Sequence, residues 1–197
     1  FRGYQPEGAK RKFPAALCVS INDEIVHVIP NEVQKIIKEG DIVSLDLGLW
    51  HRGFITDSAI TVSAGVIDDE SRKLIEITKK ALERGIENAK PGKKIGDIGH
   101  AISEVVRSSG FTLASGLTGH GVGYSVHEDP LVPNFGNKGE GEELLPGLVI
   151  AIEPMVNIGK GAIKLSKDGY TIRTRDGSRS AHFEHTVAIT EKGNIIL

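Results

Sequence analysis

Residues 44–58 constrain the fold of this chain more than any other stretch, and they read Ser-Leu-Asp-Leu-Gly-Leu-Trp-His-Arg-Gly-Phe-Ile-Thr-Asp-Ser. This segment predicts two strands joined by a tight turn, with one aspartate on each strand. If the turn is formed by His51 and Arg52, Asp46 lies directly opposite Asp57, with Cβ atoms roughly 5 Å apart on one face. A bulge at Gly53 is the alternative, and it would shift the register by one residue.

Two carboxylates that face each other across a hairpin repel, so this pair calls for an explanation. A cation between Asp46 and Asp57 would provide one, because close carboxylates suit hard divalent ions that take oxygen ligands. The alternative is a solvated hairpin that carries two acidic residues by chance. The hairpin alone leaves both interpretations open.

Composition narrows the class of protein. The chain has 197 residues, 39% of them hydrophobic and 25% charged, with a formal net charge of -2. These values predict a single globular domain over residues 1–197 and give no electrostatic reason for binding nucleic acid or a membrane. Cys18 is the only cysteine, which excludes an internal disulfide and fits a cytoplasmic location. Because the chain begins at Phe1, we also expect an N-terminal segment that precedes it.

The pattern of apolar residues predicts two helices and several strands. Helical spacing marks residues 68–89 and 95–110, whereas residues 1–14 and 124–146 are rich in glycine and proline and predict loops. The predicted strands are residues 15–29 (two strands around a turn at residues 22–23), 42–62, 111–114, 148–156, 163–165, 170–173 and 181–190. Two helices on a curved, mostly antiparallel sheet give an α+β fold.

Three further positions are unusual for a simple core. His120 lies in Gly119-His-Gly-Val-Gly123, where glycines allow close backbone approach and leave the imidazole unshielded. A flexible loop with a surface histidine is the alternative. A phosphate-binding loop is disfavoured because no lysine follows the glycines in the required place.

The other two positions are glutamates in predicted strands. Glu153 interrupts the apolar run 148–156, and a buried carboxylate needs a partner, a proton or a metal. A strand end before Pro154 is the structural alternative. Glu184 shares a strand face with Thr186 and Ala188, and a partly solvated face would also explain it.

If these five side chains converge, they form one unusual set. Asp46, Asp57, Glu153 and Glu184 bring four negative charges, and His120 adds one imidazole. Two divalent cations would balance the charge, and two metals about 3.5–4 Å apart can activate water for hydrolysis.

The motifs, taken in order, resemble those of the type I methionine aminopeptidases, which are pita-bread metallopeptidases. The matching pieces are Cys18-Val-Ser-Ile-Asn22, His27 before Ile29-Pro30, the two-aspartate hairpin, Gly119-His-Gly-Val-Gly123, His127-Glu-Asp-Pro130, Ile152-Glu-Pro-Met-Val156, Asp168-Gly-Tyr-Thr171 and Phe183-Glu-His-Thr186. They cover nearly the whole chain. The resemblance implies a pita-bread fold, with a curved sheet covered by helices and a helical segment before Phe1.

The resemblance also implies roles for individual residues. Asp57 and Glu184 match the positions that bridge two divalent ions of cobalt, manganese, iron or zinc. Asp46 matches a ligand of one ion, and His120 and Glu153 match ligands of the other. His27 and His127 match substrate-contacting histidines. The residues that match the methionine side-chain pocket are Phe13, Cys18 and Tyr170.

The implied activity is metal-dependent removal of N-terminal methionine from nascent polypeptides by a cytoplasmic monomer. Glu153 would relay a proton to the leaving amine, His127 would donate to the developing oxyanion or to the next carbonyl, and His27 would orient the scissile nitrogen. A ribosome is a further partner that this role would allow.

Two positions depart from the family pattern. Val28 stands where glycine is usual, and Val126 stands where phenylalanine is common, which would loosen one wall of the side-chain pocket. Strict methionine preference is therefore a weaker expectation than hydrolysis. The alternatives are a pita-bread peptidase of another specificity, such as a proline dipeptidase, and a non-catalytic binding protein. The short path from His127 to Glu153 disfavours the first, and the complete set of five ligand positions disfavours the second.

Overall fold

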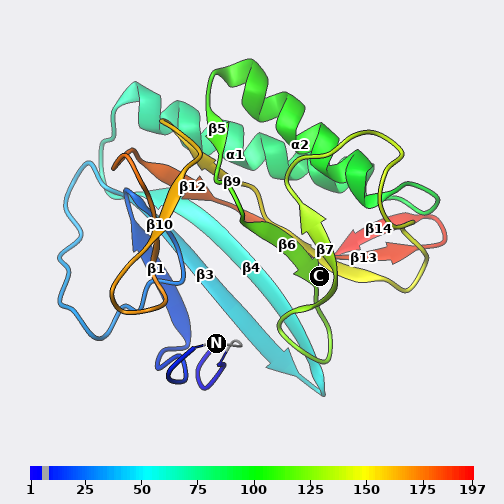
Figure 1. Cartoon of the computed structure of the whole chain (residues 1–197), viewed down its shortest axis with the longest axis horizontal. Helices are drawn as coiled ribbons and strands as arrows, with labels where there is room; N and C mark the ends of the chain where they lie inside the picture. The colour runs from blue at the N-terminus through cyan, green and yellow to red at the C-terminus, as the bar shows by residue number, and fades with distance from the viewer. Residues whose placement is uncertain (6–8) are drawn as a thin grey trace.

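The computed structural model describes residues 1–5 and 9–197, and in it two helices pack on one face of a large antiparallel sheet (Figure 1). The strands are β1 (Leu17–Ile21), β2 (Glu24–Val26), β3 (Ile42–His51), β4 (Phe54–Ser63), β5 (Thr112–Leu113), β6 (Thr118–Gly121), β7 (Glu128–Pro133), β8 (Val149–Ile152), β9 (Met155–Asn157), β10 (Ile163–Leu165), β11 (Ile172–Thr174), β12 (Ser180–His182), β13 (Glu184–Thr190) and β14 (Gly193–Ile196). The eight-stranded sheet runs β1-β3-β4-β13-β8-β6-β7, with β14 beside β13. Two three-stranded sheets, β10-β11-β2 and β12-β9-β5, complete the α+β fold.

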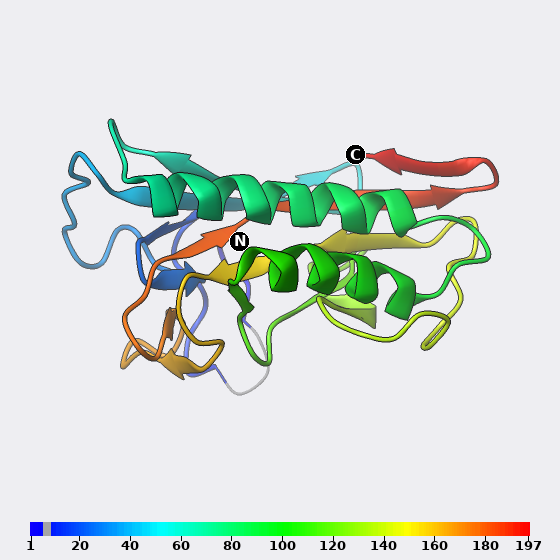
Figure 2. The same ribbon diagram turned by 90° about the horizontal axis from the view of Figure 1, so that it is seen from above.

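Both helices begin and end within a residue of the predicted positions. They are α1 (Asp69–Asn88) and α2 (Ile95–Ser109). Asp68 caps α1 by accepting a hydrogen bond of 2.8 Å from the Ser71 amide, and Gly110 ends α2 in the left-handed conformation at φ 86°. Figures 1 and 2 show the helices side by side on the same face of the sheet. Neither is long and apolar enough to cross a membrane.

The main hydrophobic core lies between this helical layer and the central strands. Leu74, Ile98 and Ile102 from the helices are fully buried, as are Ile150 and Ile152 on β8. Each such side chain contributes about 1.5–3 kcal/mol relative to exposure. Because side chains alternate along a strand, β8 turns its intervening residue toward the opposite face of the sheet, where the candidate site lies.

The β3–β4 hairpin forms as predicted, but its turn is one residue further along the chain. The turn residues are Arg52 and Gly53, with φ of 49° and 92°. Positive φ at both central residues is typical of the type I′ turn, whose twist matches that of the flanking strands, and glycine adopts it without strain. The pairing is continuous from Ile42–Ser63 to His51–Phe54, so Gly53 forms no bulge.

This register corrects the predicted direct pairing of the two aspartates. Asp46 lies opposite Ala59, and Asp57 lies opposite Gly48. The two aspartates are therefore diagonal neighbours rather than a directly opposed pair, which relieves part of their repulsion. Both side chains still point to the same face of the sheet, because the pairing differs from the prediction by an even number of residues.

Several other elements differ from the prediction. The predicted strand 148–156 is two strands, β8 and β9, separated by Glu153 and by Pro154, which has no amide hydrogen to donate. The predicted loop 124–146 contains β7, an edge strand in which Pro130 and Pro133 are tolerated. Strands β6 and β14 were not predicted, and the predicted strand 181–190 is two strands, β12 and β13, of different sheets. The predicted loop 1–14 has no helix or strand in its described part, and residues 6–8 lie outside the described residues.

Candidate active site

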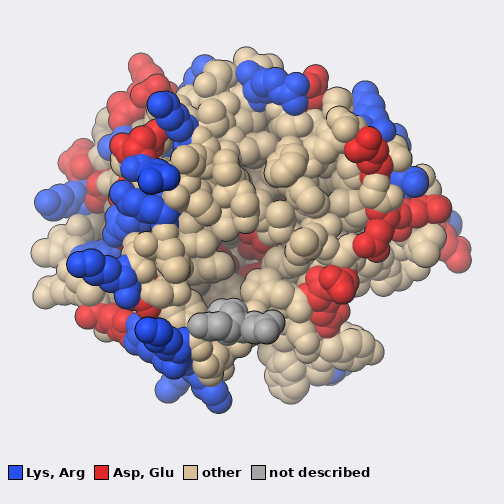
Figure 3. Space-filling view, viewed as in Figure 1, with Lys and Arg blue, Asp and Glu red and all other residues tan. Residues whose placement is uncertain are grey.

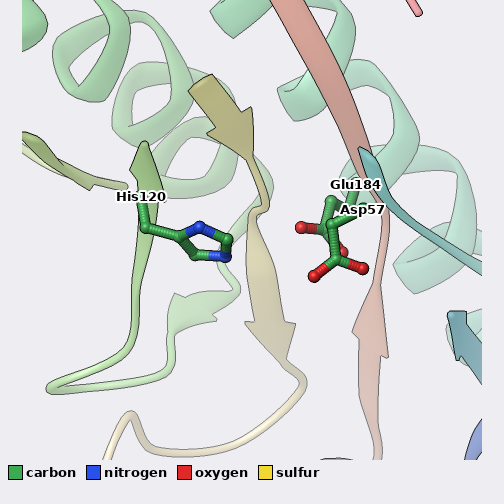
Figure 4. Close-up of side chains that lie close together, drawn as sticks. All are labelled: Asp57, His120 and Glu184. Atoms are coloured by element: carbon green, nitrogen blue, oxygen red, sulfur yellow. The ribbon is translucent and has the colours of Figure 1, made fainter. Parts of the chain in front are cut away.

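Three buried side chains from three different strands converge on the face of the sheet opposite the helices. Asp57 on β4, His120 on β6 and Glu184 on β13 each place one potential ligand atom within 4.8 Å of the other two (Figure 4). All three are at least 95% buried. Asp57 and Glu184 lie more than 120 positions apart in the sequence, and they meet because β4 and β13 are neighbours in the sheet.

The other two members of the predicted set line the same pocket. One carboxylate oxygen of Glu153, Oε1, lies 3.4 Å from Nε2 of His120. Asp46 lies on β3, directly opposite Cys18 of β1. Figure 3 shows the pocket as a hollow with acidic atoms at its floor. The structure therefore brings all five predicted residues together.

Glycines on both sides of His120 let its strand approach its neighbours. A Cβ atom at Gly119 would lie 2.2 Å from the Ala151 carbonyl oxygen, and one at Gly121 would lie 2.2 Å from the Asp129 carbonyl oxygen. Only glycine fits at either position. His120 is further fixed by a 2.9 Å hydrogen bond between its Nδ1 and the carbonyl oxygen of Gly121. A carbonyl only accepts, so Nδ1 carries the proton and Nε2 faces the pocket unprotonated.

Thr186 fixes the backbone of Asp57. Its hydroxyl accepts a hydrogen bond of 2.7 Å from the Asp57 amide and donates one of 2.8 Å to the Asp57 carbonyl. The Asp57 carboxylate accepts a third bond from the Ser58 amide at 3.0 Å. A buried hydroxyl that satisfies both backbone groups holds the aspartate in one orientation, with one carboxylate edge directed into the pocket.

The electrostatics of the site fit divalent cations. Burial raises the pKa of Asp46 to about 8, of Asp57 to about 7 and of Glu153 to about 7, and it raises the pKa of Glu184 as well. Oδ1 of Asp46 is buried and has no hydrogen-bond partner among the described residues. Four carboxylates and one imidazole are a donor set that manganese, iron, cobalt and zinc all accept.

We expect these raised pKa values to make the metal-free protein less stable as pH rises. The unfolded carboxylates titrate near pH 4 and the folded ones near 7 to 8, so the stabilisation is fully present below about pH 4 and is lost through pH 7 to 8. Urea unfolding with a chelator present should give a free energy of unfolding at least about 2 kcal/mol lower at pH 8 than at pH 5.

Asp46→Asn is the matched variant for this experiment, and its stability should fall less steeply over the same range. Added divalent cation should stabilise the wild type more at pH 8 than at pH 5, since ions bind the deprotonated carboxylates. A metal-free protein whose stability rises between pH 5 and pH 8 would contradict this electrostatic picture.

Two of the predicted substrate-contacting residues, His27 and His127, lie at the mouth of the pocket. The rings of His120 and His127 have centroids 4.3 Å apart. Burial, together with the neighbouring histidines, lowers the pKa of both His27 and His127 to about 4, so both are neutral at pH 7. His27 has a φ of 60°, which is uncommon for a residue other than glycine and costs on the order of 1–3 kcal/mol.

An inner pocket with apolar walls adjoins the carboxylates. Phe13, Cys18 and Tyr170 line it as predicted, and Phe1 joins them. The Phe13 and Tyr170 rings pack edge to face with centroids 5.3 Å apart. Burial raises the pKa of the Cys18 thiol far above its ordinary value, so the thiol stays neutral and the walls are apolar. Neither Val28 nor Val126 is among the described residues that line this pocket.

An outer groove leads away from the same histidines. It shares Val26, His27, His120, His127 and Glu153 with the inner pocket. The groove is also lined by Leu117, Thr118, Glu128, Asp129, Leu131 and Met155. The site is therefore an inner pocket that meets a wider groove at Glu153 and the three histidines.

Sequence reasoning missed two residues of the site. The hydroxyl of Tyr4 forms a 2.6 Å hydrogen bond with Nδ1 of His127, and nothing in the surrounding loop sequence signals this contact. His182 is 2% exposed, and its Nε2 lies 3.4 Å from Oε2 of Glu153. Its spacing of two residues from Glu184 was the available signal, since alternate strand residues share a face.

Comparisons of the sequence and of the structure with known proteins point to the same family. A family model described as metallopeptidase family M24 matches residues 2–191. A methionine aminopeptidase of Aquifex aeolicus is 52% identical to the chain and aligns with 100% of it and 77% of the relative. The crystal structure of methionine aminopeptidase from Thermotoga maritima superposes with a TM-score of 0.91 at 44% identity, covering 98% of this chain and 76% of that one. A prolidase from Pyrococcus horikoshii shares the fold alone, with a TM-score of 0.71 at 24% identity over 92% of this chain and 47% of that one.

Proposed function

This chain belongs to metallopeptidase family M24 and has the pita-bread fold, and from that premise we propose that it is a type I methionine aminopeptidase, which hydrolyses the peptide bond after an N-terminal methionine. One observation carries the proposal. A pocket with aromatic and thiol walls meets a buried cluster of four carboxylates and a histidine, and a wider groove begins at Glu153 and the neighbouring histidines.

The shape of the site suits an N-terminal residue. A single side chain enters the inner pocket, where the aromatic rings of Phe13 and Tyr170 make favourable contacts with a thioether. The following residues of the polypeptide lie in the outer groove. The scissile bond then lies beside Glu153, His27 and His127, the residues common to pocket and groove.

The five clustered residues would hold two divalent ions. Asp57 and Glu184 would bridge them, Asp46 would bind one, and His120 and Glu153 would bind the other. When bound, the ions polarise the scissile carbonyl and lower the pKa of water, which is the chemistry that hydrolysis needs. Manganese, iron, cobalt and zinc all match this donor set.

The side chains themselves supply proton transfer and positioning. Glu153 carries a proton between the attacking water and the leaving amine, because its carboxylate lies where the inner pocket and the outer groove meet. Tyr4 is hydrogen-bonded to Nδ1 of His127. In the tautomer in which Tyr4 donates this bond, the imidazole proton is on Nε2, from which it can donate to the developing oxyanion. His27 orients the scissile nitrogen.

The substrates in the cell would be nascent polypeptides. The protein would then act in the cytoplasm, as a monomer that can work close to the ribosome. A proline dipeptidase specificity is disfavoured because only the fold is shared with the prolidase. A non-catalytic role is disfavoured because all five ligand positions carry metal-binding side chains in one pocket.

A peptide assay tests the function. The protein loaded with manganese or cobalt should release methionine from Met-Ala-Ser, whereas the N-acetylated peptide is the matched control and should remain intact. A chelator should abolish release, and excess divalent ion should restore it. Release that persists undiminished after complete metal removal would contradict the mechanism. Faster cleavage of an X-Pro dipeptide than of Met-Ala-Ser would overturn the specificity.

The contact between Tyr4 and His127 makes a separate prediction. Tyr4→Phe removes one neutral hydrogen bond, so kcat for Met-Ala-Ser should fall about three- to tenfold while KM changes little. Tyr124→Phe is the control, since that tyrosine is 78% exposed. Steady-state kinetics measure both variants, and equal kcat values for Tyr4→Phe and wild type would rule out this role for the hydroxyl.

A further inference from the structure

His182 is the buried ionisable residue of the site that the proposed mechanism does not use. Its side chain is 2% exposed, and neither ring nitrogen has a hydrogen-bond partner among the described residues. Buried polar groups are normally paired, so this histidine needs an explanation. Its Nε2 lies 3.4 Å from Oε2 of Glu153 and 3.9 Å from Oε2 of Glu184.

Two histidines flank the carboxylate of Glu153, one beside each oxygen. Nε2 of His120 lies 3.4 Å from Oε1, and Nε2 of His182 lies 3.4 Å from Oε2. The hydrogen bond from Nδ1 of His120 to the Gly121 carbonyl leaves a lone pair on its Nε2. A lone pair that faces a carboxylate oxygen is favourable only with a cation between them, so His120 is suited to bind a metal.

His182 has the opposite arrangement. No described acceptor lies within hydrogen-bond distance of its Nδ1, so a proton there would be a buried donor without a partner. Its Nε2 forms no hydrogen bond either, but acceptors lie near it, namely Oε2 of Glu153 at 3.4 Å and Oε2 of Glu184 at 3.9 Å. The lower-cost tautomer therefore has the proton on Nε2, where it can be donated to a carboxylate oxygen.

The backbone of His182 is held independently of any ion. The hydroxyl of Thr61 accepts a 2.8 Å hydrogen bond from the His182 amide and donates one of 2.8 Å to its carbonyl. Because this uses the hydroxyl proton of Thr61, the 2.8 Å contact with Ser44 is donated by Ser44. These bonds fix the backbone from which the ring extends toward Glu153.

We infer that His182 is a positioning residue that donates its Nε2 hydrogen to Oε2 of Glu153 and so directs Oε1 toward the metal side, next to His120. The inference rests on the proposed metal centre, and it assigns two different roles to two histidines at the same carboxylate. Partners of this kind commonly change metal affinity by about 10- to 100-fold.

The direct test is the tautomeric state in the whole protein labelled with ¹⁵N and loaded with ¹¹³Cd. The signals of His182 are assigned by their loss in His182→Gln. His182 should carry its proton on Nε2 both with and without cadmium, and it should show no ¹¹³Cd–¹⁵N coupling. His120 should show coupling at Nε2. A proton on Nδ1 of His182, or cadmium coupling to its Nε2, would overturn the inference.

Substitutions of His182 test whether its proposed hydrogen bond to Glu153 affects metal affinity. A glutamine amide reaches the position of Nε2, whereas an asparagine amide reaches only the position of Nδ1. By calorimetry, His182→Leu and His182→Asn should bind manganese at least about tenfold more weakly than wild type, and His182→Gln should restore most of that loss. The control is His51→Gln in the exposed hairpin. Equal manganese affinity for the Gln and Asn variants would contradict the inference.

A failure of the positioning role of His182 can be distinguished from a failure of the proposed function. If the wild type binds manganese and releases methionine while the tautomer of His182 is wrong, only the positioning role fails. If the wild type shows no cadmium coupling to His120, the metal centre itself fails. The tautomer measurement on the wild type decides the inference even where a variant does not fold.

Discussion

Glu153→Gln should lower kcat for Met-Ala-Ser by at least about 10³-fold while the protein remains folded. The amide keeps the size of the side chain and can still offer an oxygen to an ion, but it cannot accept and return a proton. Steady-state kinetics with bound metal measured in the same sample give the result.

Glu191→Gln is the control for this variant, because that glutamate is exposed in the turn after β13. It should retain wild-type kinetics. Glu153 is proposed to serve both as ligand and as proton carrier, and the metal content separates the two roles. Turnover of Glu153→Gln within tenfold of wild type at equal metal content would exclude proton transfer by this residue.

Asp57→Asn should weaken divalent metal binding more than substitution of any of the three residues proposed to bind a single ion, by on the order of 100-fold or more. Asp57 lies in the tight cluster with His120 and Glu184, and we propose that it bridges both ions. An amide has no net charge and one carbonyl oxygen, so it can serve one ion at most and cannot bridge two. Calorimetric titration with manganese, and metal content after gel filtration, measure the effect.

The matched substitution is Asp69→Asn, at an exposed aspartate in the first turn of α1. It should bind manganese as the wild type does. Asp57→Asn should also lose activity in proportion to its occupancy, with partial recovery at high manganese concentration. Wild-type affinity and stoichiometry in Asp57→Asn would remove this aspartate from the metal centre.

The hairpin shows which part of a site can be predicted from local sequence. The two strands and the common face of Asp46 and Asp57 follow from period-two alternation, which a shift by an even number of residues leaves intact. The register depends on which two residues adopt positive φ. Arg52 and Gly53 were not identified as that pair, because an arginine at positive φ is not a typical turn signal.

Glu153, His182 and Tyr4 also show how much of the site local sequence patterns leave undetermined. Glu153 was recognised because a carboxylate in an apolar run is costly, yet the run itself divides into β8 and β9, which belong to different sheets. His182 and Tyr4 escaped prediction because their partners, Glu153 and His127, are distant in the sequence. Such contacts depend on how the small sheets and the N-terminal loop pack against the large sheet, which local patterns do not encode.

The helices were the most predictable elements. Acidic residues at the start of α1, a glycine after α2 and a regular apolar stripe on each fixed their ends to within one residue. Strand β7 was the least predictable, since its prolines resemble a loop and only its edge position makes them acceptable.

The most direct test is anomalous diffraction from crystals grown with manganese, collected on both sides of the metal absorption edge. We predict two anomalous peaks in the pocket, with Asp57 and Glu184 contacting both, Asp46 contacting one, and His120 with Glu153 contacting the other. No peak within this cluster at saturating manganese, or peaks bound only by other residues, would contradict the proposed metal centre and the hydrolytic function that depends on it.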